Sequence, residues 1–360
     1  MIESTGTPVG SSAPPESRPP VAEIPFPIRL NPHAAAAGRH HLQWMTAMGL
    51  VSAADERARL ERWELGTVVA YLFPDAEPEA LNLLTDWNGY WAIYDDQFET
   101  AAGPQPAMVA AIVDMTLAVL YARPGENPFP SAPFCNALSD MIGRIADTAV
   151  TTAWLEHLRR TVHGMLAGFL QQVLDHAQGV VLDHDALILR RRADIAMQHD
   201  YDLIAVSRGW APPESVLTTD TFTRLHNALH DAMTMLNDAY SAYRDRPIFA
   251  RNYNTVLQLE RSGMSARQAR AETGRRVQQC VGDYLDTKRS VPELLDLLGL
   301  DTRTRAGVLQ YLTDVETLFA GADLIQRLSD RYSPEARYSD AAPTHVADWE
   351  FARHARLLRR

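Results

Sequence analysis

The feature that most constrains the fold of this chain is the spacing of its apolar residues. In "LNLLTDWNGYWAIYDD", "TAWLEHLRRTVHGMLAGFLQQVL" and "FTRLHNALHDAMTMLNDAYSAYRD" they recur at i, i+3 and i+4, the period of one face of a helix. Long alternations typical of strands are scarce, so we predict an all-α fold. Because no repeat of solenoid period is visible, a single-domain helical bundle is favoured over a helical array.

Composition and charge exclude several classes of protein. Hydrophobic residues make up 46% of the 360 residues, enough for a large core. The formal net charge of −11 argues against a nucleic-acid partner, which needs a basic stripe. No apolar run reaches about 18 residues, so we expect no membrane insertion. The two cysteines, Cys135 and Cys280, are far apart and lack metal-ligand spacing, which favours a reducing, cytoplasmic location.

Three regions are expected along the chain. Residues 1–22 are rich in Pro and Ser and lack the basic start and apolar stretch of a secretory signal, so we predict a disordered leader. Residues 23–335 form the helical domain, since nothing inside them is typical of an interdomain linker. Residues 336–360 are Pro-punctuated and end in basic residues, and are predicted to be a lid or a flexible tail.

One acidic cluster interrupts an apolar helical segment. Asp95, Asp96 and Glu99 follow a run of aromatic residues in "WAIYDDQFET". On a helix Asp95 and Glu99 lie one turn apart on the same face, with Asp96 beside them. Carboxylates at this spacing suit Mg²⁺, which usually shares its ligands with a substrate phosphate. Taken alone, the cluster is better explained by a solvated acidic helix end.

A second stretch, "NDAYSAYRD", carries a stripe of oxygen donors. Asn237, Ser241 and Asp245 stand at i, i+4 and i+8, on one face of a predicted helix. Arg244 is one position off the stripe and could reach the same anion. Chance spacing on a surface helix would also give this pattern. Two oxygen-rich helix faces in one all-α chain nevertheless indicate a shared metal site.

These residues resemble class I terpene synthases of the bacterial type. Such enzymes carry a DDxx(D/E) motif, matched by Asp95, Asp96 and Glu99, and a later (N/D)Dxx(S/T)xx(K/R)(D/E) motif. The second motif is matched at every specified position by Asn237, Asp238, Ser241, Arg244 and Asp245. The resemblance spans residues 25 to 335 and implies a helical bundle of the class I terpenoid synthase type with a central active-site cavity.

Further markers of the family fall on particular residues. A pyrophosphate-sensing Arg is expected 46 residues before the Asn of the second motif, which is Arg191. The linker position then falls on Asp194 and the effector on Ile195. An Arg-Tyr pair expected ten residues after a Gly matches Arg331 and Tyr332, after Gly321.

Two positions depart from the family pattern. Ala196 stands where Gly is common, and Ile325 stands where Trp is common. Because the sensor motif is also altered, the choice of Arg191 over Arg190 and Arg192 depends on the 46-residue spacing alone.

The resemblance implies that three Mg²⁺ ions bridge the two motifs and bind the diphosphate of a linear isoprenoid. Metals and Arg or Tyr donors would stabilise the leaving diphosphate in a water-poor site. We expect this role of Arg191, Arg244, Arg331 and Tyr332. Aromatic faces stabilise carbocations as they do ammonium groups. Trp91, one turn before Asp95, and Trp87, two turns before it, are the candidates, although either could be ordinary core.

The predicted function is therefore Mg²⁺-dependent cyclisation of farnesyl diphosphate to a sesquiterpene with release of diphosphate. The alternatives are a C10 or C20 substrate, a chain-elongating prenyltransferase of the same fold, and a non-catalytic helical binding protein. A homodimer is suggested by the family alone. His40, His41 and the pair His199 and Asp200 show no metal-ligand spacing, and no phosphate-binding glycine motif points to a nucleotide cofactor.

Overall fold

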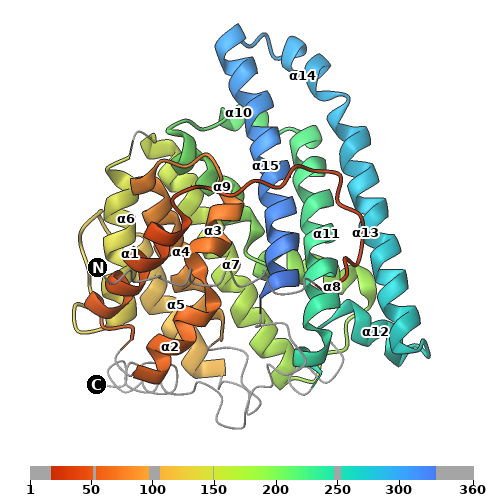
Figure 1. Cartoon of the computed structure of the whole chain (residues 1–360), viewed down its shortest axis with the longest axis horizontal. Coiled ribbons are helices and arrows are strands. Elements are labelled where there is room, and N and C mark those ends of the chain that lie inside the picture. The colour runs from red at the N-terminus through yellow and green to blue at the C-terminus, as the bar shows by residue number, and fades with distance from the viewer. Residues whose placement is uncertain (1–17, 52–53, 97–105, 149, 247–252, 330–360) are drawn as a thin grey trace, which may run out of the picture.

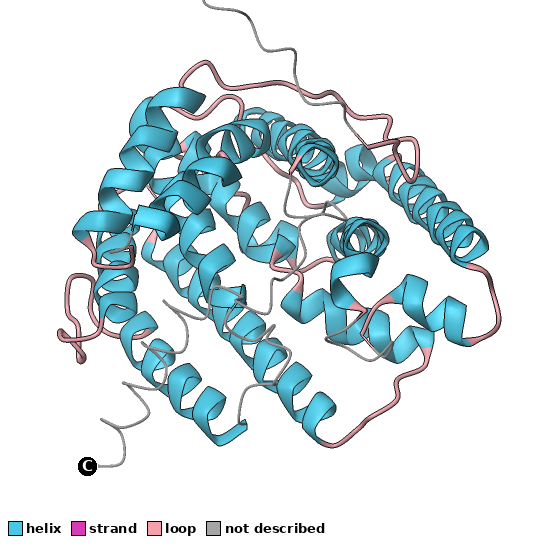
Figure 2. Ribbon diagram, turned by 60° about the horizontal axis from the view of Figure 1, so that its bottom comes forward, coloured by secondary structure: helices cyan, strands magenta, loops and turns pink. Residues whose placement is uncertain are grey.

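The computed structural model describes residues 18–51, 54–96, 106–148, 150–246 and 253–329. All regular secondary structure in these ranges is helical (Figures 1 and 2), so the all-α prediction is confirmed. The helices are α1 (Ala34–Ala47), α2 (Ala54–Trp63), α3 (Leu65–Leu72), α4 (Pro78–Asp96), α5 (Pro106–Leu120), α6 (Pro133–Ala146), α7 (Thr152–Ala177), α8 (His184–Asp194), α9 (Met197–Arg208), α10 (Glu214–Leu217), α11 (Asp220–Asp245), α12 (Thr255–Arg261), α13 (Ala266–Lys288), α14 (Val291–Leu297) and α15 (Thr302–Leu328).

The two segments that carry the metal motifs are helices, as predicted. The acidic cluster begins in the last turn of α4, and the Asn/Ser/Asp stripe occupies the last turns of α11. In Figure 1, α11 runs beside α13 and α15, whereas α4 lies in the other half of the bundle with α1 and α3. Because apolar residues lie on most sides of α4, this helix is enclosed by its neighbours.

A buried ion cluster fixes α4 on the side facing α1. Asp86 is fully buried and accepts hydrogen bonds from His40 at 3.0 Å, His41 at 3.1 Å and Arg144 at 2.7 Å. Burial alone would raise the pKa of this carboxyl, but the three donors hold the pKa below its usual range. The adjacent histidines His40 and His41 therefore serve α4 packing, consistent with their lack of metal-ligand spacing.

Two glycines allow helices to approach closely near the centre of the bundle. A Cβ on Gly321 of α15 would lie 2.4 Å from the carbonyl oxygen of Tyr71, at the end of α3. A Cβ on Gly168 of α7 would lie 2.9 Å from the Cβ of Ala193, at the end of α8. Gly321, noted in the sequence only for its spacing to the Arg-Tyr pair, therefore has a packing role of its own.

The residues near the ends of the described ranges can be compared with the three predicted regions of the chain. Residues 18–22, assigned to the leader, contact the bundle: Arg18 donates to the carbonyls of Gln326 and Ser329, both at 2.8 Å, and the Val21 amide donates to Tyr240 at 3.2 Å. Residues 1–17 and 336–360 lie outside the described residues, so the division remains a prediction. Within the described ranges, no helix is long and apolar enough to cross a bilayer, and Cys135 and Cys280 are free thiols.

Candidate active site

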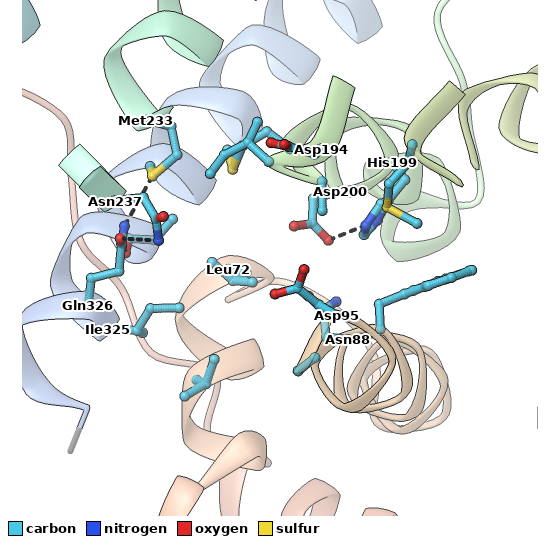
Figure 3. A pocket seen from close by; sticks show the side chains of 18 of the residues that line it. Leu72, Asn88, Asp95, Asp194, His199, Asp200, Met233, Asn237, Ile325 and Gln326 are labelled. Carbon is cyan, nitrogen blue, oxygen red and sulfur yellow. Dashed lines mark hydrogen bonds and ion pairs between the residues drawn. The ribbon is translucent and has the colours of Figure 1, made fainter. Parts of the chain in front are cut away.

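A cavity of about 260 Å³ lies between α4 and α11, near the lower end of the ~300–1,000 Å³ typical of small-ligand pockets. Most of its wall is apolar, contributed by Trp63, Leu65, Val68, Leu72, Trp91, Met165, Phe169, Met197, Met233 and Ile325. Its polar groups are Asn88, Asp95, Arg191, Asp194, His199, Asp200, Asn237, Arg244 and Gln326. Figure 3 shows many of these side chains facing the same space.

The α4 wall places the start of the acidic motif in this cavity. Asp95 lines it from the last turn of α4, and Trp91 lines it one turn earlier. Asp96 is the last residue of α4, but its side chain lies outside the described part of the chain, as does all of Glu99. The structure therefore locates one of the three predicted acidic donors.

The α11 wall contributes Asn237, whose amide is held on both sides. Its Oδ1 accepts a hydrogen bond from Arg191 Nη2 at 3.0 Å, and its Nδ2 donates to Gln326 Oε1 at 3.0 Å. Ser241 and Asp245 follow on the same helix face, but they are buried and lie behind the described cavity wall. Ser241 donates to Asp245 Oδ2 at 2.5 Å.

The loop after α11 holds the rest of the motif from behind. Asn254, fully buried, donates to Asp245 Oδ2 at 2.9 Å and to the Asp238 carbonyl at 2.8 Å. The Thr255 amide donates to Asp238 Oδ2 at 2.7 Å. Burial raises the pKa of Asp238 to about 6, against the lowering effect of Arg191 and the Thr255 hydrogen bonds. Asp238 thus joins helix to loop, whereas Asn237 faces the cavity.

The connection between α8 and α9 settles which arginine faces the site. Arg191 lines the cavity, is 12% exposed, and donates to Asp194 at 2.8 Å as well as to Asn237. Arg190 instead pairs with Asp175 at 3.0 Å, and Arg192 with Asp231 at 2.6 Å. The 46-residue spacing therefore selected the arginine that the structure turns inward.

The family's glycine position lies at the same connection. Asp194 and Ile195 line the cavity, and Ala196 follows with φ +65° in the left-handed region. Glycine reaches this conformation without the steric cost that a Cβ imposes. The departure from the family pattern at Ala196 therefore puts a strained residue between α8 and α9. Ile325, the other departure, is part of the cavity wall.

The remaining predicted substrate contacts have different outcomes. Arg244 lines the cavity, 9% exposed, with its Nε 3.4 Å from Asp245 Oδ1. Arg331 and Tyr332 lie outside the described residues. Trp91 is in the wall. Trp87 is fully buried and is not among the residues that line the described cavity, and its ring centroid lies 5.8 Å from that of Trp91, so its role as a substrate contact stays a prediction. One helical turn toward the centre of α4 takes its ring into the core.

The sequence analysis missed a polar group in the wall, His199 and Asp200 of α9. Trp87 Nε1 donates to His199 Nδ1 at 3.2 Å, and that nitrogen lies 3.5 Å from Asp200 Oδ1. Burial lowers the pKa of His199 to about 4 and raises the pKa of Asp200 to about 7, although a hydrogen bond from Asn88 opposes the latter shift. The available signal was the group His199, Asp200 and Asp202 inside the otherwise largely apolar "MQHDYDLIAV" segment. Figure 3 shows the Asp200 carboxyl directed toward that of Asp95.

The donors present fit a hard divalent cation. Asn237, Ser241 and Asp245 offer amide, hydroxyl and carboxylate oxygens, and Asp95 offers another carboxylate, all of the kind Mg²⁺ prefers. Both motifs also lie at the C-terminal ends of their helices, where the helix dipole is negative. The Arg191 guanidinium already contacts the Asn237 oxygen, so positive charge stands at this position. Among the described residues, no three His, Cys, Asp or Glu side chains are grouped so that they could hold a metal ion.

Comparison with solved structures defines the class of protein. The chain matches wild-type cucumene synthase with a TM-score of 0.73 and 28% identity, covering 85% of this chain and 99% of that one. It also matches a-eudesmol synthase with a TM-score of 0.77 and 23% identity, covering 84% and 97% of the two chains, a likeness of fold. The fold is that of the class I terpene synthases, as the sequence motifs predicted.

The family model for "Terpene synthase family 2, C-terminal metal binding" matches residues 86–283, more than half of the chain. The chain belongs to this family, and is thus a terpene synthase with a domain for divalent metal. Pristinol synthase of Streptomyces pristinaespiralis is 24% identical over 313 residues, covering 86% of this chain and 84% of that protein. The 7-epi-alpha-eudesmol synthase of Streptomyces viridochromogenes, described as (2E,6E)-farnesyl diphosphate cyclizing, is 26% identical over 290 residues, covering 79% and 84%.

Proposed function

We propose that this enzyme ionises and cyclises farnesyl diphosphate, with Mg²⁺ as its metal, and releases diphosphate and a cyclic sesquiterpene. The observation that carries the proposal is that Asp95 of α4 and Asn237 of α11 line one cavity together with Arg191 and Arg244. The rest of the wall is largely apolar and includes the aromatic side chains of Trp63, Trp91 and Phe169. The farnesyl chain length is supported by the Streptomyces viridochromogenes relative, which cyclises (2E,6E)-farnesyl diphosphate.

The metal ligands are proposed to be Asp95, Asp96 and Glu99 on one side and Asn237, Ser241 and Asp245 on the other, holding three Mg²⁺ ions. Bound Mg²⁺ would neutralise charge that develops on the departing diphosphate. Ser241 and Asp245 are bonded to each other in the structure, but a carboxylate has further acceptor positions beyond those used by Ser241 and Asn254, so Asp245 could also bind a cation.

The residues that bind diphosphate are proposed to be Arg191, Arg244, Arg331 and Tyr332. Arg191 and Arg244 are mostly buried, which strengthens their attraction to an anion in a water-poor site. Arg191 contacts the Asn237 oxygen in the structure, so we infer that it leaves this oxygen when metal and diphosphate arrive. Asp194 would hold its other nitrogen in place during that movement.

The apolar wall is proposed to fold the isoprenoid chain and keep water out. Trp91 presents the aromatic face nearest Asp95, and such a face stabilises a carbocation by about 1–2 kcal/mol when desolvated. Ile195, next to the strained Ala196, lies where the chain of the substrate would meet the α8–α9 connection. Trp87 supports Trp91 from behind.

The experiment is to incubate the purified full chain and MgCl₂ with C10, C15 and C20 diphosphates. Diphosphate release and volatile products, identified by gas chromatography with mass detection, are the readouts. We expect cyclic C15 hydrocarbons or alcohols from farnesyl diphosphate and no turnover with excess chelator. Absence of diphosphate release from all three substrates would contradict the proposal.

Two alternatives can be separated in the same assay. Incorporation of added isopentenyl diphosphate would identify a chain-elongating enzyme, and larger release from the C10 or C20 substrate would change the chain length. A cytoplasmic location and a homodimer remain predictions, the latter checked by light scattering of the eluted protein.

A further inference from the structure

The side chain of Gln326, on α15, contacts the predicted metal ligand Asn237 across the cavity. Gln326 is 5% exposed. Its Nε2 lies 3.1 Å from Met233 Sδ and 3.1 Å from the Ala322 carbonyl oxygen, and its Oε1 accepts from Asn237 Nδ2 at 3.0 Å. Figure 3 shows these contacts joining α15 to α11 at one end of the cavity.

The orientation of the Gln326 amide follows from its partners. A thioether sulfur and a backbone carbonyl can only accept hydrogen bonds, so the NH₂ group of Gln326 must face Met233 and Ala322. The oxygen of Gln326 then faces Asn237, and it too can only accept. Asn237 must therefore present its NH₂ group to Gln326, which leaves its Oδ1 directed toward Arg191 and the cavity.

This constraint matters because an asparagine amide has two orientations with opposite chemistry. With Oδ1 in the cavity, Asn237 offers an oxygen ligand, but after a flip it would offer two N–H donors that repel a cation. Arg191 favours the same orientation in the structure, but it is the residue proposed to move to the diphosphate. Gln326 does not have to move.

We infer that Gln326 is a positioning residue for the metal site, holding the Asn237 amide with its oxygen toward the cation. This inference rests on the proposed function, since it takes Asn237 as a ligand. The backbone of Gln326 is itself held, because Arg18 donates to its carbonyl oxygen at 2.8 Å.

The test compares Gln326→Leu with the wild type in two measurements. The first is diphosphate release from farnesyl diphosphate as MgCl₂ is varied, and the second is the rise in thermal-unfolding midpoint as MgCl₂ is added with inorganic diphosphate. Losing one orienting hydrogen bond is worth about 1–1.5 kcal/mol, so half-saturating Mg²⁺ should rise about fivefold to tenfold in both. The rate at saturating Mg²⁺ should stay within about twofold of the wild type.

A second background separates orientation from packing. Asn237→Asp has an oxygen at both positions of the carboxylate, so either orientation presents an oxygen to the cation. The other oxygen would then face the Gln326 oxygen. In the Asn237→Asp background, Gln326→Leu should leave the Mg²⁺ requirement unchanged or lower it. The same fivefold rise in both backgrounds would overturn the inference.

Two further variants provide a replacement and a control for Gln326→Leu. Gln326→Met has a similar size and cannot orient Asn237, so it replaces Gln326→Leu if that variant unfolds. The control is Gln310→Leu, which replaces an exposed glutamine of α15 that donates to Asp314. This variant should keep the wild-type Mg²⁺ requirement. A wild-type protein without diphosphate release would contradict the proposed function, whereas active wild type with an unchanged Gln326→Leu would contradict this inference alone.

Discussion

The two helices that carry the metal motifs, α4 and α11, differ in where buried hydrogen bonds attach them to the rest of the bundle. In α11 the hydrogen bonds lie inside the motif, because Asn254 and the Thr255 amide contact Asp238 and Asp245 directly. In α4 the buried ion cluster lies at Asp86, nine residues before Asp95 and about 13 Å away along the helix axis. We conclude that the α11 donors contribute to folding as well as to the proposed metal site, whereas the Asp86 cluster fixes α4 through residues outside its acidic motif.

The largest effect should come from the α4 side. Replacing Asp95 and Asp96 together with Asn removes two carboxylates proposed to hold metal, so diphosphate release should fall by about 10³-fold or more, equivalent to about 4 kcal/mol. The unfolding midpoint without metal should remain close to that of the wild type, because the Asp86 cluster is intact. Retained activity, or retained stabilisation by Mg²⁺ with diphosphate, would show that the site is assigned wrongly.

On the α11 side, Asn254→Ala should damage folding and activity together. It removes an N-cap of α12, worth about 1 kcal/mol. It also takes one buried donor from Asp245, which keeps Ser241, and one from the Asp238 carbonyl, at about 1–3 kcal/mol. We expect a loss of about 3 kcal/mol in the free energy of unfolding, measured with denaturant.

A matched cap on α15 gives the control for that loss. Asp301 accepts from the Arg303 and Thr304 amides and is exposed, so Asp301→Ala should cost about 1 kcal/mol and leave activity unchanged. Equal losses of unfolding free energy from Asn254→Ala and Asp301→Ala would show that the contacts of Asn254 with α11 contribute no more to folding than an exposed helix cap does.

Acid should destabilise the α11 half through its buried histidines. Burial lowers the pKa of His226 to about 4 and that of His230 to about 3. Their unfolded pKa is higher, so the unfolded state binds more protons, and stability falls as the pH drops below about 6.5. Each contributes up to about 1.4 kcal/mol per pH unit. Asp200, whose pKa is raised to about 7 by burial, opposes this trend between pH 7 and 4.

The histidine contribution can be isolated by substitution. His230→Gln should show a weaker fall in unfolding free energy between pH 6.5 and 5 than the wild type, by about 1 kcal/mol per pH unit. The exposed His163→Gln should follow the wild type. Parallel curves for His230→Gln and the wild type would argue against a depressed pKa at this residue.

The smallest effect concerns the connection that brings Arg191 to the α11 wall. Ala196→Gly relieves the left-handed strain at φ +65°, while it adds freedom to the unfolded chain. A net stabilisation of up to about 1 kcal/mol should appear as a rise of a few degrees in the unfolding midpoint. A lower midpoint would mean that the alanine methyl contributes packing that outweighs the strain.

The sequence by itself determined the helical class, the two motifs and the arginine that faces the cavity. Helical periodicity is a local property, and the residues of each motif lie within about two turns of one helix. They therefore share a helix face regardless of how the helices pack. The 46-residue separation between Arg191 and Asn237 was informative because the two residues line the same cavity. Their side chains form a hydrogen bond there.

Only the tertiary structure decided which tryptophan faces the cavity and which residues outside the motifs contact the site. Trp87 and Trp91 lie one turn apart and have the same chemistry, yet Trp87 is fully buried with a hydrogen bond to His199 of α9, whereas Trp91 lines the cavity. Asp200 and Gln326 carry no motif, and their roles depend on neighbours more than 90 residues away, such as Asn88 and Met233. Such contacts are set by helix packing, which the period of a single helix does not specify.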